Sequence, residues 1–220
     1  MRGFEIVMPN LRPFAIAAAL ALGLVACAEQ GADAPKDAAV EAPPLTEGTW
    51  ALDPAGTRLT YVSIKAGEIA EANRFDRLSG SVAADGTASL DIDLASVNTG
   101  VDIRNERMRE IFFQVAENPK ATITAKLDPK AFAGLAVGQS LTRPLKATVA
   151  LKGMEQALET EVLVTRVSAD RVTVVPTAPV IITTDMFGLT DELGELRALA
   201  QLPSITPAVP VTFTLAFNRS

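Results

Sequence analysis

Through most of this chain the apolar residues recur at every second position, and this period constrains the fold more than any other feature. It is clearest in residues 87–94 and returns in 123–127 and 211–217. Such alternation is typical of half-buried β-strands, with apolar side chains on one face and polar ones on the other. It also predicts that Asp91 and Asp93 face outward, so they are not expected to form a catalytic carboxylate pair.

Short turns separate the candidate strands. Asp85-Gly86, Lys152-Gly153 and Ala169-Asp170 are the turn candidates, and Asp-Gly between alternating segments is a strong hairpin signal. The candidate strands are residues 58–65, 78–83, 87–94, 123–127, 141–151, 157–167, 171–182 and 211–217. About eight strands with no regularly repeated helices between them indicate an all-β fold, either an antiparallel barrel or a sandwich.

Two segments depart from this period and predict short helices. Residues 102–115 carry apolar residues near helical spacing, with Asp102 available as an N-cap. Residues 191–202 do the same, with Thr190 as the expected cap and Pro203 as the stop. Both helices are expected to pack against an end of the strand structure.

Composition removes several classes of function. The chain has no His and one Cys, so a Ser-His-Asp triad, a His-ligated metal and an intramolecular disulfide are excluded, and no metal or cofactor is expected. Its net charge of −6 argues against a nucleic-acid-binding protein. Aromatic residues make up only 5%, so small aliphatic side chains fill the inward positions. An eight-stranded barrel lined in this way can hold one small ligand or be packed solid.

The N-terminal segment predicts export and acylation. Residues 14–26 form an uncharged apolar run after Arg12, which is typical of a secretory signal and short for a membrane span. The only Cys, Cys27, ends this run after Leu24-Val25-Ala26, a pattern similar to a bacterial lipobox. The alternative is an ordinary signal peptide beside a chance cysteine.

These observations divide the chain into three parts. Residues 1–26 are expected to be a lipoprotein signal peptide, with translation starting at Met1 or Met8, and 27–47 an acylated Cys27 followed by a disordered acidic tether. Residues 48–220 are expected to be the folded domain. Since Ala28 is not the aspartate associated with inner-membrane retention, the periplasmic face of an outer membrane is the favoured location.

Six short segments follow one another along the chain: Trp50-Ala51-Leu52-Asp53, residues 75–82, Val97-Asn98-Thr99-Gly100 with Arg104-Asn105 and Met108-Arg109, Phe112-Phe113 with Asn118-Pro119 and 122–124, Leu151-Lys152-Gly153, and Phe187-Gly188-Leu189. In this order they resemble the YceI-like family of lipocalin-like periplasmic proteins. Three departures stand out, because Ala66 and Arg107 replace family His residues and Thr184 replaces a family Arg.

The resemblance implies a lipocalin-like β-barrel of about eight strands, with one or two short helices. It also implies a non-enzymatic carrier whose barrel cavity holds a polyprenyl chain, an isoprenoid quinone or a fatty-acid-like amphiphile. The expected cavity residues are Tyr61, Phe75, Leu90, Ile92, Leu94, Phe112, Phe113, Ile123, Ile182, Phe187, Phe213 and Leu215. Tyr61 and Phe75 could equally be ordinary core residues.

Two further expectations concern partners. Arg104 and Arg107 could contact a phosphate or carboxylate head of the ligand, or they could belong to a solvated helix face paired with Glu106 and Glu110. Membrane attachment through Cys27 and a homodimer are also expected. The alternative function is a protein-interaction or stress-protective lipoprotein with a solid barrel and no lipid ligand.

Overall fold

The computed structural model describes residues 43–220. Cys27, the predicted signal peptide and most of the predicted tether therefore lie outside the described residues. Among the helices that are described, none has the length and apolar character needed to cross a membrane.

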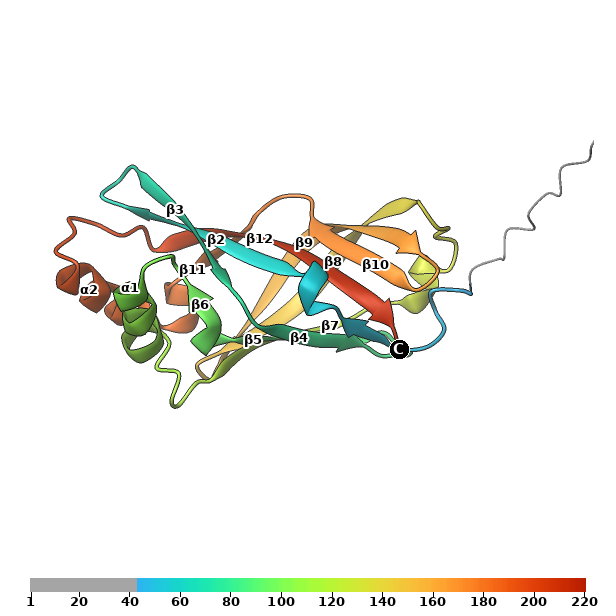
Figure 1. The fold of residues 1–220 in the computed structure, drawn as a ribbon, viewed down its shortest axis with the longest axis horizontal. Helices are drawn as coiled ribbons and strands as arrows, with labels where there is room; N and C mark the ends of the chain where they lie inside the picture. Colours follow the sequence, from blue (N-terminus) through green and yellow to red (C-terminus); the bar gives the residue numbers. More distant parts are fainter. Residues whose placement is uncertain (1–42) are drawn as a thin grey trace, which may run out of the picture. The chain divides into compact units, whose positions relative to one another are not determined.

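Eight antiparallel strands form a closed barrel, because the ring of strands that starts at β1 returns to it through β12 (Figure 1). In ring order they are β1 (Trp50–Leu52), β4 (Leu78–Val82), β5 (Thr87–Asp93), β7 (Lys120–Lys126), β8 (Ser140–Leu151), β9 (Met154–Ser168), β10 (Arg171–Pro176) and β12 (Ala208–Arg219). The predicted eight-stranded barrel is confirmed, and the alternative of a sandwich is wrong.

The long strand β12 extends the sheet beyond the ring. Its C-terminal half pairs with β10 and β1, and its N-terminal half pairs with β11 (Val180–Thr183) and β2 (Arg58–Lys65). From β2 the sheet continues through β3 (Ile69–Phe75) to the two-residue β6 (Val97–Asn98). These additional strands lengthen the wall at one end of the barrel.

The helices gather at that same end (Figure 1). The helix α1 (Asp102–Arg107) continues directly into the π-helical segment η3 (Met108–Phe112), and α2 (Thr190–Leu199) packs against η3. Short 3-10 turns are η1 (Pro54–Gly56), η2 (Leu94–Ser96), η4 (Pro129–Phe132) and η5 (Asp185–Phe187). We call the end with α1, α2 and the β2–β3 turn the helix end. The opposite end, with residues 43–50 and the C-terminus, is the terminal end.

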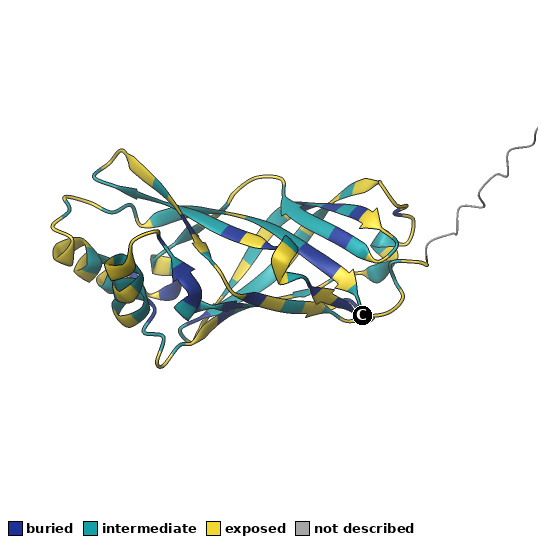
Figure 2. Cartoon of the chain, viewed as in Figure 1, coloured by how far each residue is buried: buried dark blue, intermediate teal, exposed yellow. Residues whose placement is uncertain are grey.

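Alternation explains why β5 lies in the barrel wall. Its register with β4 and β7 brings Leu90 beside Gly80 and Ile123, so the apolar face points inward. On the outward face Asp91 binds Lys120, at 2.9 Å between carboxylate oxygen and Nζ. The expected outward direction of Asp91 is confirmed. Figure 2 shows the same alternation as changes of burial along the strands.

The structure differs from the expected strands, most clearly at residues 171–182 and at β3. Residues 171–182 form two strands, β10 and β11, with a break between Pro176 and Val180. Pro176 and Pro179 supply no N–H for a continuous ladder, which explains the break. Strand β3 was not expected as a strand, because inward Glu71 and Asn73 hide its period.

Both predicted helices exist, but neither of the predicted caps holds. Each helix begins at the residue that was expected to cap it, because the carbonyl of Val101 accepts the N–H of Asn105 and the carbonyl of Leu189 accepts that of Leu193. Asp102 and Thr190 are therefore first helical residues rather than N-caps.

Arginines and backbone carbonyls hold the terminal end together. Arg166 is 3% exposed, and its guanidinium donates to the carbonyls of Leu135 and Ala169 at 3.1 and 3.2 Å. It also donates to the carbonyl of Pro43, which ties the start of the described chain to β9. Arg219 stacks on Trp50, with its guanidinium carbon 4.7 Å from the ring centroid.

Candidate functional site

The barrel is hollow. Its interior holds a cavity of about 1020 Å³, at the upper end of the range usual for small-molecule sites. Inward residues of the ring strands supply its wall, for example Leu90 of β5, Val149 of β8 and Val162 of β9. Because these side chains are aliphatic and of moderate size, they leave the centre of the barrel open. A solid barrel is therefore excluded for the described residues.

The structure brings all of the expected cavity residues together. Each of them lines the cavity: Tyr61, Phe75, Leu90, Ile92, Leu94, Phe112, Phe113, Ile123, Ile182, Phe187, Phe213 and Leu215. Their position in the wall follows from the period of two in the strands and from the packing of η3 against the barrel. Contact with a ligand remains a prediction for each of them.

Four aromatic rings form a connected group on the wall nearest the helices. Tyr61 and Phe75 have ring centroids 5.8 Å apart, as have Phe75 and Phe113, and Phe112 meets Phe113 edge to face at 5.0 Å. Such tilted and edge-on arrangements stabilise aromatic pairs beyond their burial alone. Phe112 and Phe113 come from η3, so this group joins the helical segment to the sheet.

At the helix end the cavity reaches solvent. Val101, Ile103 and Leu199 line the cavity, yet they are 43%, 53% and 46% exposed. The same apolar side chains thus belong to the interior wall and to the outer surface.

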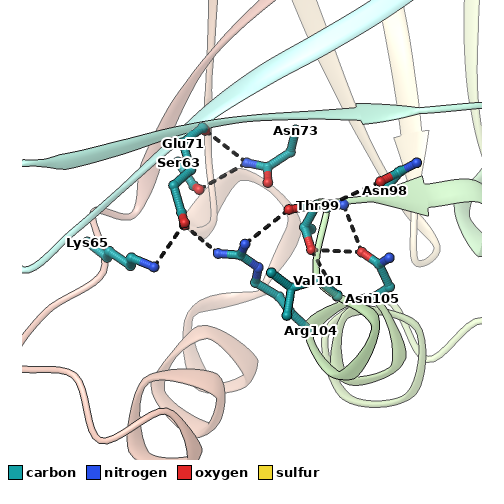
Figure 3. Close-up of polar contacts among 10 residues, drawn as sticks. Ser63, Lys65, Glu71, Asn73, Asn98, Thr99, Val101, Arg104 and Asn105 are labelled. Atoms are coloured by element: carbon teal, nitrogen blue, oxygen red, sulfur yellow. Dashed lines mark hydrogen bonds and ion pairs between the residues drawn. The ribbon is translucent and has the colours of Figure 1, made fainter.

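Several polar and charged side chains gather on one part of this wall, which we call the polar cluster: Ser63, Lys65, Glu71, Asn73 and Arg104 (Figure 3). All five line the cavity. The β2–β3 register explains why they meet, because Ser63 lies opposite Glu71 and Tyr61 lies opposite Asn73. Arg104 reaches the group from α1.

Glu71 is the centre of the charges in the polar cluster. Its carboxylate binds Lys65 Nζ at 3.0 Å and accepts a hydrogen bond from Arg104, whose second terminal nitrogen donates to the carbonyl of Thr99 at 3.0 Å. Partial burial raises the pKa of the Glu71 carboxyl, but the hydrogen bonds and positive charges of Arg104 and Lys65 lower that pKa by more. Glu71 is therefore ionised at neutral pH.

The expectation for the arginines of α1 needs correction. Arg104 does not pair with Glu106 or Glu110 on a solvated helix face, because it faces β3 and pairs with Glu71. Arg107 also lines the cavity. Both arginines thus border the cavity, as the head-group expectation required, but Arg104 already has a carboxylate partner.

Sequence reasoning missed Ser63, Lys65, Glu71 and Asn73. A signal for the first two exists, since Leu59 and Tyr61 set an inward period that continues through Ser63 and Lys65. No comparable signal marks Glu71 and Asn73.

The chemistry available in the cavity is mainly that of binding. Burial raises the pKa of the Tyr61 phenol, so this hydroxyl stays neutral in the cavity wall. Within residues 43–220, no group of three Asp, Glu, His or Cys side chains is arranged to hold a metal ion.

Comparison with known proteins supports the architecture. The model of the YceI-like domain family matches residues 50–217. A solved polyisoprenoid-binding domain from Saccharophagus degradans, described as implicated in plant cell wall breakdown, is 39% identical with a TM-score of 0.77, over 79% of this chain and 100% of that one. BcnA from Burkholderia cenocepacia is 19% identical with a TM-score of 0.58, over 75% of this chain and 98% of that one. Among curated proteins, none matches the chain.

Proposed function

Since this chain belongs to the YceI-like family, we propose that it is a non-enzymatic binding protein that holds one long apolar amphiphile inside its barrel. The ligand is a polyprenyl compound, an isoprenoid quinone or a fatty-acid derivative. The observation that carries this proposal is the large and mainly apolar cavity, which opens at the helix end. The polyisoprenoid-binding relative from Saccharophagus degradans adds support.

The energetics are adequate for such a ligand. Burying about 400 Å² of apolar ligand surface at roughly 25 cal/mol per Å² contributes about 10 kcal/mol. Association costs an estimated 4–15 kcal/mol in lost translational and rotational freedom and in ordering of side chains. A long, fully enclosed chain is therefore needed for tight binding, and a short chain binds weakly.

The proposed location is the periplasm, with Cys27 acylated and inserted in the membrane and the outer membrane favoured. Two or more acyl chains anchor a protein durably, whereas one chain does not. Attachment of this kind keeps the binding domain close to a reservoir of its ligand. Mass spectrometry of the N-terminal peptide of the mature protein tests the anchor, and sedimentation of the chain in detergent tests whether it forms a homodimer.

The binding proposal is tested by filling the cavity. Ala147 lines the cavity and its neighbour Lys146 points outward and pairs with Glu159. We expect Ala147→Trp to weaken binding of a fluorescent polyene fatty acid by about tenfold or more, which corresponds to about 1.4 kcal/mol. Lys146→Trp, the matched control, should bind as the unmodified chain does.

Organic extraction of the protein from its native membrane, followed by mass spectrometry, identifies the natural ligand. A prenyl or acyl compound in stoichiometric amount supports the proposal. Equal binding by both Trp variants, together with no apolar compound in the extract, contradicts it.

A further inference from the structure

The cavity runs along the whole barrel, from the helix end to the terminal end. On β12, alternate residues from Val209 to Phe217 line it, and these two residues are eight positions apart. At roughly 3.4 Å per residue this is about 27 Å of strand, or roughly 20 Å along the axis of a barrel whose strands tilt by about 40°. The described residues that line the cavity at the terminal end include Leu45, Thr46, Ala83, Ala84, Gly86, Leu127 and Phe132.

The two ends of the cavity differ in charge. Within residues 43–220, the charged side chains that line it are Lys65, Glu71, Arg104 and Arg107, which come from β2, β3 and α1 at the helix end. Those described at the terminal end are uncharged. A ligand with a polar head and an apolar chain therefore has its head at the helix end and the end of its chain toward the terminal end.

The β4–β5 turn covers the terminal end of the cavity only thinly. Ala83 and Ala84 of this turn are small and exposed, and Gly86 has a φ of +84°, which disfavours any side chain there. Two larger side chains at this end come from outside the strands, because Leu45 precedes β1 and Phe132 belongs to η4. Both line the cavity and pack against the buried core.

Leu45 is held in place by the backbone on both sides of it. The N–H of Glu47 donates to the carbonyl of Pro44 at 3.2 Å, so that residues 44–47 form a turn, which we call the Leu45 turn. Arg219 of β12 donates to the carbonyls of Pro44 and Glu47 and so fixes this turn to the barrel wall. None of these contacts uses the Leu45 side chain, so that side chain can be changed without releasing the turn.

We propose that the Leu45 turn closes the terminal end of the cavity, and that Leu45 limits the length of the apolar chain that the barrel holds. A chain oriented with its head at the helix end meets the Leu45 side chain at the far end of the cavity. This inference rests on the proposed function and deepens it, because it assigns the residue that sets which chain lengths bind.

The test measures how affinity depends on chain length. Three prenols of increasing length, farnesol, geranylgeraniol and solanesol, each displace a fluorescent polyene fatty acid from the full chain. Each methylene that the cavity buries raises the affinity by about fourfold, whereas a methylene beyond the stop adds nothing. We expect the affinity to rise from farnesol to geranylgeraniol and to rise no further for solanesol.

Two substitutions of Leu45 should shift this limit in opposite directions. Leu45→Ala should raise the affinity for solanesol by about tenfold. Leu45→Trp should lower the affinity for geranylgeraniol by about tenfold. Both variants should bind farnesol as the unmodified chain does, because the farnesol chain is too short to reach Leu45, and this result shows that the rest of the cavity is intact.

Val137→Ala is the matched control for Leu45→Ala. Val137 lies before β8 at the terminal end, is 48% exposed and does not line the cavity, so this variant should keep the length preference of the unmodified chain. An unchanged preference among the three prenols in both Leu45 variants overturns this inference and leaves the proposed function in place. A steady rise in affinity up to solanesol in the unmodified chain does the same. A chain that binds none of the three prenols overturns both.

Discussion

Arginine is prominent at both ends of the barrel, but its partners differ. At the terminal end, Arg166 donates only to backbone carbonyls, and each of its guanidinium nitrogens has an acceptor. At the helix end, Arg104 meets the carboxylate of Glu71 and the carbonyl of Thr99, and its Nε stays unpaired beside the cavity. Arg166 therefore stabilises the fold, whereas Arg104 borders the cavity as well as pairing with Glu71.

The largest expected effect comes from removing the buried arginine of the terminal end. Arg166→Met should lower the free energy of unfolding by about 3 kcal/mol, because several carbonyls lose a charged donor in a buried place. Arg104→Met should cost only about 1 kcal/mol, since Arg104 is partly exposed and Lys65 still binds Glu71. Urea unfolding curves measure both values.

The two variants should have the opposite order of effects on ligand binding, with the larger effect for Arg104→Met. Arg166→Met is expected to keep the affinity for the fluorescent polyene fatty acid, and Arg104→Met is expected to lower it, because Arg104 lines the cavity and Arg166 does not. If Arg104→Met were the more destabilising variant, or if Arg166→Met weakened the binding of the fatty acid, the distinction between the two ends would fail.

A smaller effect is expected where α2 is attached to the barrel. Lys152, in the β8–β9 turn, binds Glu192 of α2 at 2.6 Å, and both side chains are mostly buried. Burial raises the pKa of the Glu192 carboxyl, but the hydrogen bond and positive charge of Lys152, with a backbone hydrogen bond, lower it by more, to below its ordinary value of 4.5. The ion pair therefore contributes stability above pH 4.5 and loses it as pH falls through the lower pKa of the folded state.

Hydrogen exchange can show whether this loss of stability is confined to the helix end. Below about pH 4.5, amide protection in α2 should fall by several-fold, while protection in the C-terminal half of β12 stays high. Glu192→Gln should lower the protection of α2 at pH 7 as well and should remove most of its dependence on pH. Equal loss of protection at both ends would indicate global unfolding instead.

Much of this architecture could be predicted from the sequence, and the exceptions have physical causes. Alternation identified the inward residues of β5 and β12, because a strand with one apolar face has only one stable orientation in a barrel wall. The helical spacing of residues 102–115 placed Phe112 on the face toward the barrel, and the family resemblance added Phe113. The ring closure between β1 and β12 involves residues about 170 positions apart, and the family resemblance was needed to choose a barrel over a sandwich.

The polar cluster could not be predicted in the same way. Glu71 and Asn73 point inward although they are polar, so they break the period that reveals a strand. Their partner Arg104 lies on a helix 33 residues away from Glu71, and its pairing with that carboxylate rather than with Glu106 or Glu110 depends on how α1 packs against β3. Binding sites often violate local patterns in this way, because their polar atoms serve the ligand rather than the fold.

The smallest expected effect is at an exposed ion pair of the terminal end. In the β4–β5 turn, Asp85 accepts hydrogen bonds from Lys126 and from Thr87, and these lower the pKa of its carboxyl to about 2. Lys126→Met should raise that pKa toward its ordinary value of 3.8, as measured by NMR titration, and should leave the urea midpoint at neutral pH almost unchanged. The stability that this pair does contribute is present above pH 3.8 and disappears as pH falls through about 2. Because water and salt screen both exposed side chains, a shifted pKa here has little consequence for the fold, whereas the mostly buried ion pair at α2 contributes more to stability. A large fall in the urea midpoint for Lys126→Met would show that exposure to solvent does not explain why the two ion pairs contribute differently to stability.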